Sequence, residues 1–238
     1  MDFQKEQEVT CPECGKVHKV IVYERIMAHS QPELKKKLLT NELFKFTCED
    51  CQTTMPLIYP CLYQDMDKGY MIWFAPASNG AMQEKIAAYN VDSLLDDKYK
   101  EMNRRYKLRM VTSVNSMIEK ILIFDEDMDD RSIEVQKVML AAQVQSSDQY
   151  NKDAVRAIFF EVLPQGGYAF TLLFEQAEPY TVKLDMEQYY RIYTRNKNTF
   201  EENTPEGFSL IQTKWGVEQF NAMMRDAGKA KGKRRKRF

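Results

Sequence analysis

The sequence predicts an α+β protein with two folded parts and a basic tail. Residues 1–145 combine short β-branched runs around two Cys-x-x-Cys pairs with two amphipathic helical patterns. Residues 153–227 alternate strand-like runs with turn signals and helical patterns, which is typical of a small antiparallel-sheet α+β unit. Residues 228–238 are basic and small, with almost no apolar side chain, so we expect a disordered basic tail.

Five runs in the first part are rich in β-branched and aromatic residues and are predicted strands. They are Lys19–Tyr23, Phe44–Thr47, Leu57–Tyr63, Tyr70–Phe74 and Lys107–Val111. The third and fourth runs flank Asp67-Lys68-Gly69, which indicates a β-hairpin.

A short helix is predicted between the first two strands. Ser30 and Glu33 have the spacing of a capping box, and Pro32 falls in the first turn, where a missing N–H costs nothing. Asn41 is a plausible left-handed stop for this helix.

Two longer helices follow a polar stretch, residues 79–106, which is interpreted as a helical or loose connection. Ser113 caps the first helix, and its apolar residues recur at helical spacing: Val114, Met117, Ile118, Ile121 and Leu122. The second begins near Asp129 or Asp130 and repeats the pattern in Val135, Val138, Met139 and Ala142. We expect the two to pack as a helical hairpin, followed by a polar linker over residues 143–152.

The second folded part is predicted to begin with a three-stranded sheet. Its strands are Val155–Leu163, Tyr168–Phe174 and Tyr180–Leu184, and Pro164-Gln165-Gly166-Gly167 is a strong hairpin signal between the first two. Asp185 caps a helix that carries Tyr189, Tyr190 and Tyr193. A strand-like run, Phe208–Gln212, precedes a last helix capped by Thr213.

The charges are unevenly distributed along the chain. The tail carries seven positive charges and no acidic residue, on Lys229, Lys231, Lys233, Arg234, Arg235, Lys236 and Arg237. Since the whole chain has a formal net charge of −1 and the tail contributes +7, residues 1–228 carry −8. A cationic tail on an acidic body favours a polyanionic partner, because such a segment binds polyanions by counterion release.

Four of the five cysteines form two pairs with the spacing of zinc knuckles. The pairs are Cys11-Pro-Glu-Cys14-Gly and Cys48-Glu-Asp-Cys51-Gln, which together supply four soft ligands. The sequence therefore predicts one structural Zn²⁺ held by Cys11, Cys14, Cys48 and Cys51 in a zinc-ribbon-like domain. A redox dithiol and an unmetallated pair remain open alternatives.

The other cysteine and the two histidines receive no functional role. Cys61 is interpreted as a buried small hydrophobe rather than a reactive thiol. His18 is interpreted as a solvated or capping residue, because four cysteines already suffice for the metal, and His29 as structural.

An ordered set of motifs resembles the CpXC family. The motifs are CPECG, PELKKKLL and LIYPCLYQD, followed by RMVTSVNSMIEKILIF and DDRSIEVQK, and together they cover about the first 145 residues. This resemblance implies a zinc-binding domain of undefined biochemical role. It supports the metal site and says nothing about residues after 145.

The acidic run Asp125–Asp130 lacks the glycine and distal glutamate of a calcium loop, so we expect its last aspartates to cap the following helix.

No catalytic constellation is recognisable. The alternative of an enzyme would place Glu119, Asp129, Asp130 and Arg131 as acid, base and anion binder. Tyr189, Tyr190 and Tyr193 offer an alternative role as a stacking surface for nucleic-acid bases, but packing within the protein is the simpler interpretation.

The leading interpretation is a non-enzymatic adaptor or binding module that is associated with nucleic acid through its tail. An anionic membrane surface, an acidic protein partner, a purely solubilising tail and a structural subunit of a larger assembly are the alternatives. The chain shows neither a secretory signal nor an apolar run long enough to span a bilayer, so we expect a soluble cytoplasmic protein.

Overall fold

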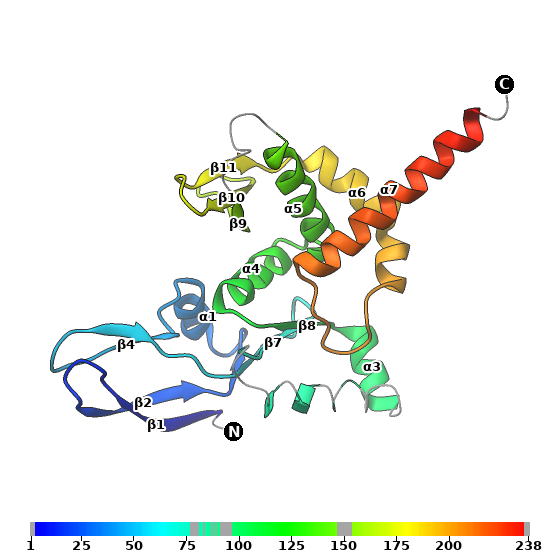
Figure 1. Ribbon diagram of the computed structural model, residues 1–238. Coiled ribbons are helices and arrows are strands. Elements are labelled where there is room, and N and C mark those ends of the chain that lie inside the picture. The colour runs from blue at the N-terminus through cyan, green and yellow to red at the C-terminus, as the bar shows by residue number, and fades with distance from the viewer. Residues whose placement is uncertain are drawn as a thin grey trace. The chain divides into compact units, whose positions relative to one another are not determined.

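The computed structural model describes residues 3–76, 81–82, 84–86, 88, 90, 97–146 and 154–235. The chain divides into two compact units (Figure 1). The N-terminal unit comprises Met1–Ile121 with Pro205–Ser209, and the C-terminal unit comprises Leu122–Thr204 with Leu210–Phe238. The predicted α+β class is confirmed, whereas the units divide the chain differently from the predicted domains, 1–145 and 153–227.

Two small β-hairpins carry the cysteine pairs in the N-terminal unit. In the first, β1 (Gln4–Thr10) pairs antiparallel with β2 (Val17–Tyr23). In the second, β4 (Lys45–Thr47) pairs antiparallel with β5 (Thr54–Pro56). The loop of each hairpin contains one Cys-x-x-Cys pair, which places both pairs at hairpin tips.

Helix α1 (Pro32–Leu39) lies between the two hairpins in the sequence and buries Leu38. The predicted capping box is wrong, because the residue before the helix is Gln31 and no side chain caps the first turn. Pro32 supplies the start instead, since its φ suits the first helical position. The predicted stop is confirmed: Asn41 has φ of 58° and its N–H donates to the Leu38 carbonyl over 2.9 Å.

A four-stranded mixed sheet forms the centre of the N-terminal unit. Its strands lie in the order β3 (Arg25–Met27), β6 (Cys61–Asp65), β7 (Tyr70–Phe74) and β8 (Lys107–Val111). The predicted hairpin between β6 and β7 is confirmed, with Asp65 opposite Tyr70 and Gly69 at φ of 72°. The two outer pairings are parallel.

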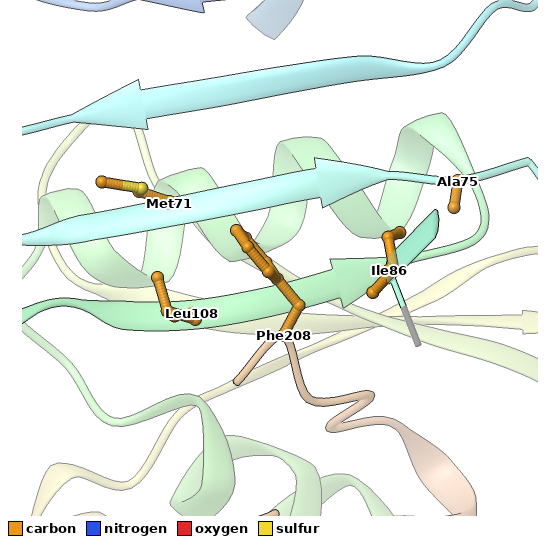
Figure 2. Packing of buried hydrophobic residues seen from close by; sticks show 5 residues of the cluster. All are labelled: Met71, Ala75, Ile86, Leu108 and Phe208. Carbon is orange, nitrogen blue, oxygen red and sulfur yellow. The ribbon is translucent and has the colours of Figure 1, made fainter. Parts of the chain in front are cut away.

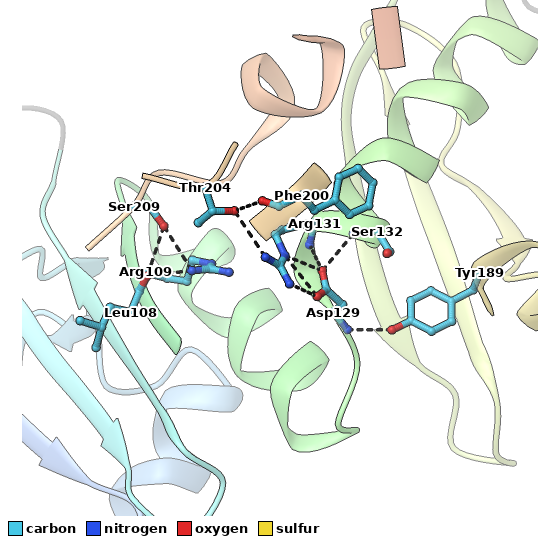
Figure 3. A network of polar contacts seen from close by, with 9 residues as sticks. All are labelled: Leu108, Arg109, Asp129, Arg131, Ser132, Tyr189, Phe200, Thr204 and Ser209. Atoms are coloured by element: carbon cyan, nitrogen blue, oxygen red, sulfur yellow. Dashed lines mark hydrogen bonds and ion pairs between the residues drawn. The ribbon is translucent and has the colours of Figure 1, made fainter. Parts of the chain in front are cut away.

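The segment Pro205–Ser209, named here the return segment, belongs to the N-terminal unit although it is distant in sequence. Ser209 forms a parallel bridge with Arg109 at the edge of β8, and the Met110 N–H donates to the Ser209 carbonyl over 3.0 Å. The Ser209 hydroxyl also accepts from the Arg109 guanidinium (Figure 3). The prediction of Phe208–Gln212 as a strand of the second part is therefore wrong: only Ser209 makes a bridge, and it belongs to the N-terminal unit.

Phe208 anchors the return segment in the hydrophobic core of this unit. Its ring lies among Met71, Leu108 and Ile86 (Figure 2) and meets the Trp73 ring edge to face, with centroids 5.0 Å apart. The Asn90 side chain holds the Phe208 backbone on both sides, since its Oδ1 accepts from the N–H and its Nδ2 donates to the carbonyl. No sequence pattern indicates this pairing, because 118 residues separate the partners.

Helices follow β8 along the chain and lead into the C-terminal unit. Within the predicted connection 79–106, the structure describes α3 (Asp97–Arg105) and helical residues before it, while 91–96 lie outside the described residues. The Ser113 hydroxyl caps α4 (Val114–Asp125) by accepting from the Ser116 N–H. The boundary between the units falls within α4, after Ile121.

The next helix, α5 (Asp130–Gln145), finds its packing partners on α7 and α6 inside the C-terminal unit. The two predicted helices thus form as expected, but the pattern of helical packing differs from the predicted hairpin. The predicted linker 143–152 is helical to Gln145, and residues 147–152 lie outside the described residues.

The C-terminal unit contains a three-stranded antiparallel sheet with helices. Its strands are β9 (Val155–Val162), β10 (Tyr168–Phe174) and β11 (Tyr180–Lys183), with β10 in the centre. The predicted β9–β10 turn is confirmed, with Gly166 and Gly167 both at positive φ. Asp185 caps α6 (Met186–Glu202) as predicted, by accepting from the Gln188 N–H.

The last helix, α7 (Thr213–Arg235), extends through most of the segment predicted to be a disordered tail. Lysine, arginine and alanine are good helix formers, and a helix that is already nucleated propagates at little cost. Residues 236–238 lie outside the described residues. Among the described residues, no helix has both the length and the apolar character that a membrane span requires.

Candidate metal centre

Both cysteine pairs lie in turns of the same backbone design. In the first turn the Gly15 N–H donates to the Cys11 carbonyl, and the Cys11 N–H donates to the Lys16 carbonyl, both over 2.9 Å. The second turn repeats these bonds between Gln52 and Cys48 and between Cys48 and Thr53, again over 2.9 Å. The two turns are therefore matched knuckles, each closing the end of a short hairpin.

The residue after the second cysteine of each knuckle adopts the left-handed conformation. Gly15 has φ of 71°, as its lack of a Cβ allows, and Gln52 has φ of 60°. The Gln52 side chain donates to the Glu49 carbonyl over 2.9 Å, which offers local compensation for the unfavourable backbone. Glutamine at this position thus departs from the usual glycine without changing the turn.

The four sulfur atoms form one compact cluster. Cys11 Sγ lies 3.5 Å from Cys51 Sγ, Cys14 Sγ lies 3.6 Å from Cys48 Sγ, and all four lie within 4.8 Å of one another. Tetrahedral thiolates about 2.3 Å from a metal ion are about 3.8 Å apart. Because a disulfide needs about 2.05 Å, the distances fit metal ligands, and all four cysteines are free.

The cluster has an apolar side and a solvent side. Cys11 and Cys48 are buried against Val9 and Phe46, with Val20, Met55 and Leu57 packed around them. Cys14 and Cys51 are exposed. Cys11 and Cys48 therefore lie on the apolar side of the cluster, and Cys14 and Cys51 lie on the solvent side.

The thiols influence one another's protonation. The hydrogen bond with the Thr53 hydroxyl, followed by the Thr53 backbone N–H, lowers the pKa of Cys51 to about 6. The Lys16 backbone N–H lowers the pKa of Cys14, but desolvation and hydrogen bonds with the other three thiols outweigh it and raise that pKa to about 12. Four clustered thiols cannot all ionise without a cation, so metal binding must displace protons.

His18 is not the solvated residue that the sequence suggested. Its side chain is 13% exposed, and its Nε2 lies 3.3 Å from Cys48 Sγ and 3.3 Å from Asp50 Oδ2. Its ring also packs against Phe46, with centroids 5.3 Å apart. His29, in contrast, makes an exposed contact with Asp67.

A model of the CpXC protein family matches residues 9–137, which is more than half of the chain and includes all four cysteines. The chain belongs to the CpXC family. Comparisons with curated proteins and with solved structures returned no match. The CpXC match ends within α5, so the rest of the C-terminal unit, including α7, lies outside the match, and so does the return segment of the N-terminal unit.

The candidates for an enzymatic site in this CpXC protein do not form one site within either unit. Glu119 belongs to the N-terminal unit, and the other three belong to the C-terminal unit. Asp129 caps α5 by accepting from the Arg131 and Ser132 N–H groups, and its carboxylate pairs with the Arg131 guanidinium, with 2.6 Å between Nη2 and Oδ2 (Figure 3). The expected capping role of the acidic run is thus confirmed for Asp129.

A cavity of about 170 Å³ in the C-terminal unit gathers none of these four residues. Its lining comes from α5, β10, β11 and the start of α6, and includes Gln136, Leu140, Phe170, Lys183 and Gln188. Its charged side chains are Lys183 and Asp185, and the Asp185 carboxylate caps α6 by accepting from the Gln188 N–H.

The remaining predicted residues have clear surroundings. Cys61 is 1% exposed, and burial raises the pKa of its thiol to about 12, so it is the unreactive core residue that we expect. Tyr189 is buried and its hydroxyl accepts from the Asp129 N–H over 2.7 Å, which confirms packing for this tyrosine. Of the tail residues, Lys229, Lys231, Lys233, Arg234 and Arg235 belong to α7, and Lys236 and Arg237 lie outside the described residues.

The sequence reasoning missed Lys16, Asp50 and Thr53, which contact the cysteines or each other around the site. Each lies within two residues of one of the four cysteines, so proximity in sequence was the available signal.

Proposed function

We propose that this CpXC protein holds one structural Zn²⁺ and acts as a non-enzymatic scaffold that binds nucleic acid through the basic end of α7. The observation that carries the proposal is the closed cluster of four thiols at tetrahedral spacing. Four thiolates select Zn²⁺ or iron among the common metals, and a complete shell of four cysteines is a form that structural zinc takes.

A catalytic role for the metal is disfavoured by the donor set. A zinc ion that activates water needs an open coordination position, and four thiolates leave none. Four negative ligands also reduce the Lewis acidity of the ion. The metal would therefore contribute folding energy to the two hairpins, whose strands are only three to seven residues long.

The metal proposal is tested by the metal content of purified full-length protein and of a Cys48→Ala variant, measured by elemental analysis. We expect one zinc per wild-type chain and loss of zinc with loss of hairpin structure in the variant. Iron in place of zinc, with the red colour of an iron–thiolate centre, would contradict the zinc assignment. A folded wild-type protein that contains neither zinc nor iron would contradict the proposed metal site.

Nucleic-acid binding is supported by the distribution of charge along the chain. Seven cations fall within residues 229–237, whereas residues 1–228 carry −8. Five of the seven belong to α7, where Lys229 and Lys233 are separated by about one helical turn. We therefore expect the cationic end of α7 to bind the phosphates of a nucleic acid and not to read its base sequence.

The binding test compares two double variants of the full chain across a salt series. Lys229→Gln with Lys233→Gln removes two charges from α7, and Lys36→Gln with Lys37→Gln removes two exposed charges from α1. For wild type the slope of log affinity against log salt should approach about −6, and the α7 variant should reduce its magnitude by about 2. The α1 variant should leave the slope unchanged.

Equal slopes for both variants would contradict a role for α7. Absence of binding by wild type to single- and double-stranded nucleic acid would leave a protein partner or an anionic membrane surface, which the same variants test with acidic vesicles.

A further inference from the structure

Three charged or polar side chains join the two knuckles beside the thiol cluster. The Lys16 ammonium pairs with Asp50 Oδ1, Asp50 Oδ2 lies 3.3 Å from His18 Nε2, and that same nitrogen lies 3.3 Å from Cys48 Sγ. Lys16 and His18 belong to the first knuckle and its strand β2, whereas Cys48 and Asp50 belong to the second. The hairpins share no strand pairing, so these contacts cross between two separate sheets.

His18 lies outside the tetrahedron rather than inside it. The four sulfurs form a group within 4.8 Å of one another, and His18 forms such a group with Cys48 and Asp50 but not with the other cysteines. The imidazole therefore approaches the cluster behind one vertex. A fifth ligand would need to face the centre.

The chemistry of Cys48 and Asp50 fixes the direction of these contacts. A metal-bound thiolate and a carboxylate both accept, so His18 Nε2 must carry the hydrogen and share it between Cys48 Sγ and Asp50 Oδ2. The His18 ring packs against Phe46, and its side chain is only 13% exposed. These surroundings hold the ring in this orientation. Donation to the sulfur withdraws negative charge from a ligand that is itself buried.

We propose that His18 is a positioning residue for the metal: its Nε2–H, shared with Asp50, holds the Cys48 thiolate in place, Lys16 holds Asp50, and the network slows metal release. This inference rests on the proposed zinc site. Partners of metal ligands commonly change metal affinity by about 10- to 100-fold.

The decisive comparison is between His18→Gln, which keeps an N–H donor, and His18→Leu, which removes it. Zinc transfer from the full-length protein to a chromogenic chelator should be about 10- to 100-fold faster in His18→Leu. It should be close to wild type in His18→Gln. His29→Leu is the matched control, since that histidine is exposed and contacts Asp67 rather than the cluster, and should release zinc at the wild-type rate.

Cobalt substitution gives a readout that a merely structural role would not move. A hydrogen bond lowers the energy of the sulfur lone pairs, so the thiolate-to-cobalt charge-transfer band should shift to longer wavelength in His18→Leu and return in His18→Gln. Unchanged band position and release rate in His18→Leu would overturn the proposal. A wild type that binds no metal would instead overturn the proposed function.

One measurement on the wild type keeps the inference testable if His18→Leu fails to fold. A long-range proton–nitrogen spectrum of the zinc-loaded protein reports which imidazole nitrogen carries the proton. Protonated Nε2 is expected. An unprotonated Nε2 would refute donation to Cys48.

Discussion

Gly15 and Gln52 occupy equivalent positions in the two knuckles, and both take the left-handed backbone conformation. A Cβ built on Gly15 would meet no atom within 4 Å, so side-chain space places no demand on this residue. Glycine is favoured there for the backbone alone, because a left-handed residue with a Cβ costs about 1–2 kcal/mol.

Gly15→Ala should therefore lower the free energy of unfolding of the zinc-loaded protein by about 1 kcal/mol without changing its metal content. Urea denaturation followed by circular dichroism measures the loss. Gly166→Ala is the control: its φ is 89° and its Cβ would also meet nothing, so it should cost a similar amount away from the metal. A loss of zinc in Gly15→Ala would mean that the turn cannot tolerate the substitution.

At this scale the four clustered cysteines could be predicted and their surroundings could not. The spacing of Cys11, Cys14, Cys48 and Cys51 is a local pattern with a chemical meaning, and it led to the same four residues that cluster in the structure. The contact between His18 and Cys48 joins residues 30 positions apart. No periodicity encodes such a pair, because it depends on how the two hairpins meet.

Helices α5 and α7 approach closely at Gly216. A Cβ at this position would lie 2.9 Å from the Glu134 carbonyl oxygen and 3.1 Å from its carbon, which are backbone atoms that cannot move aside cheaply. The periodicity of both helices was visible in the sequence. It showed which face of each helix is apolar but not which helix that face meets, and so the predicted partner of α5 differs from the observed one.

Gly216→Ala provides a test with an unusual sign. In most helix interiors this change stabilises by about 1 kcal/mol, whereas the clash with α5 should make it destabilising by about 1–3 kcal/mol. Gly232→Ala in the same helix is the control, and it should be neutral or stabilising. Thermal unfolding of both variants decides the matter, and a stabilised Gly216→Ala protein would show that the two helices pack less closely.

The chain passes between its two units three times, after Ile121, Thr204 and Ser209. Sequence patterns predicted the strands and helices on each side of these crossings, because such patterns are local. They assigned the return segment to the neighbouring elements in sequence, since nothing in Gly207-Phe208-Ser209 indicates the edge of β8. Long-range pairing of a short segment is the part of this fold that composition and periodicity leave undetermined.

Phe208→Ala should detach the return segment from the N-terminal unit. The ring fills a core position that is 3% exposed, and removing a buried phenylalanine costs about 3–5 kcal/mol. Because the Met110 N–H donates to Ser209, hydrogen exchange at Met110 should accelerate with that loss, while exchange in β10 should change less. Leu210→Ala, at a neighbouring residue that is 42% exposed, should leave Met110 protected. If Met110 stayed protected in Phe208→Ala, the pairing of the segment with β8 would not depend on its aromatic anchor, and the Asn90 contacts to the Phe208 backbone would have to hold it.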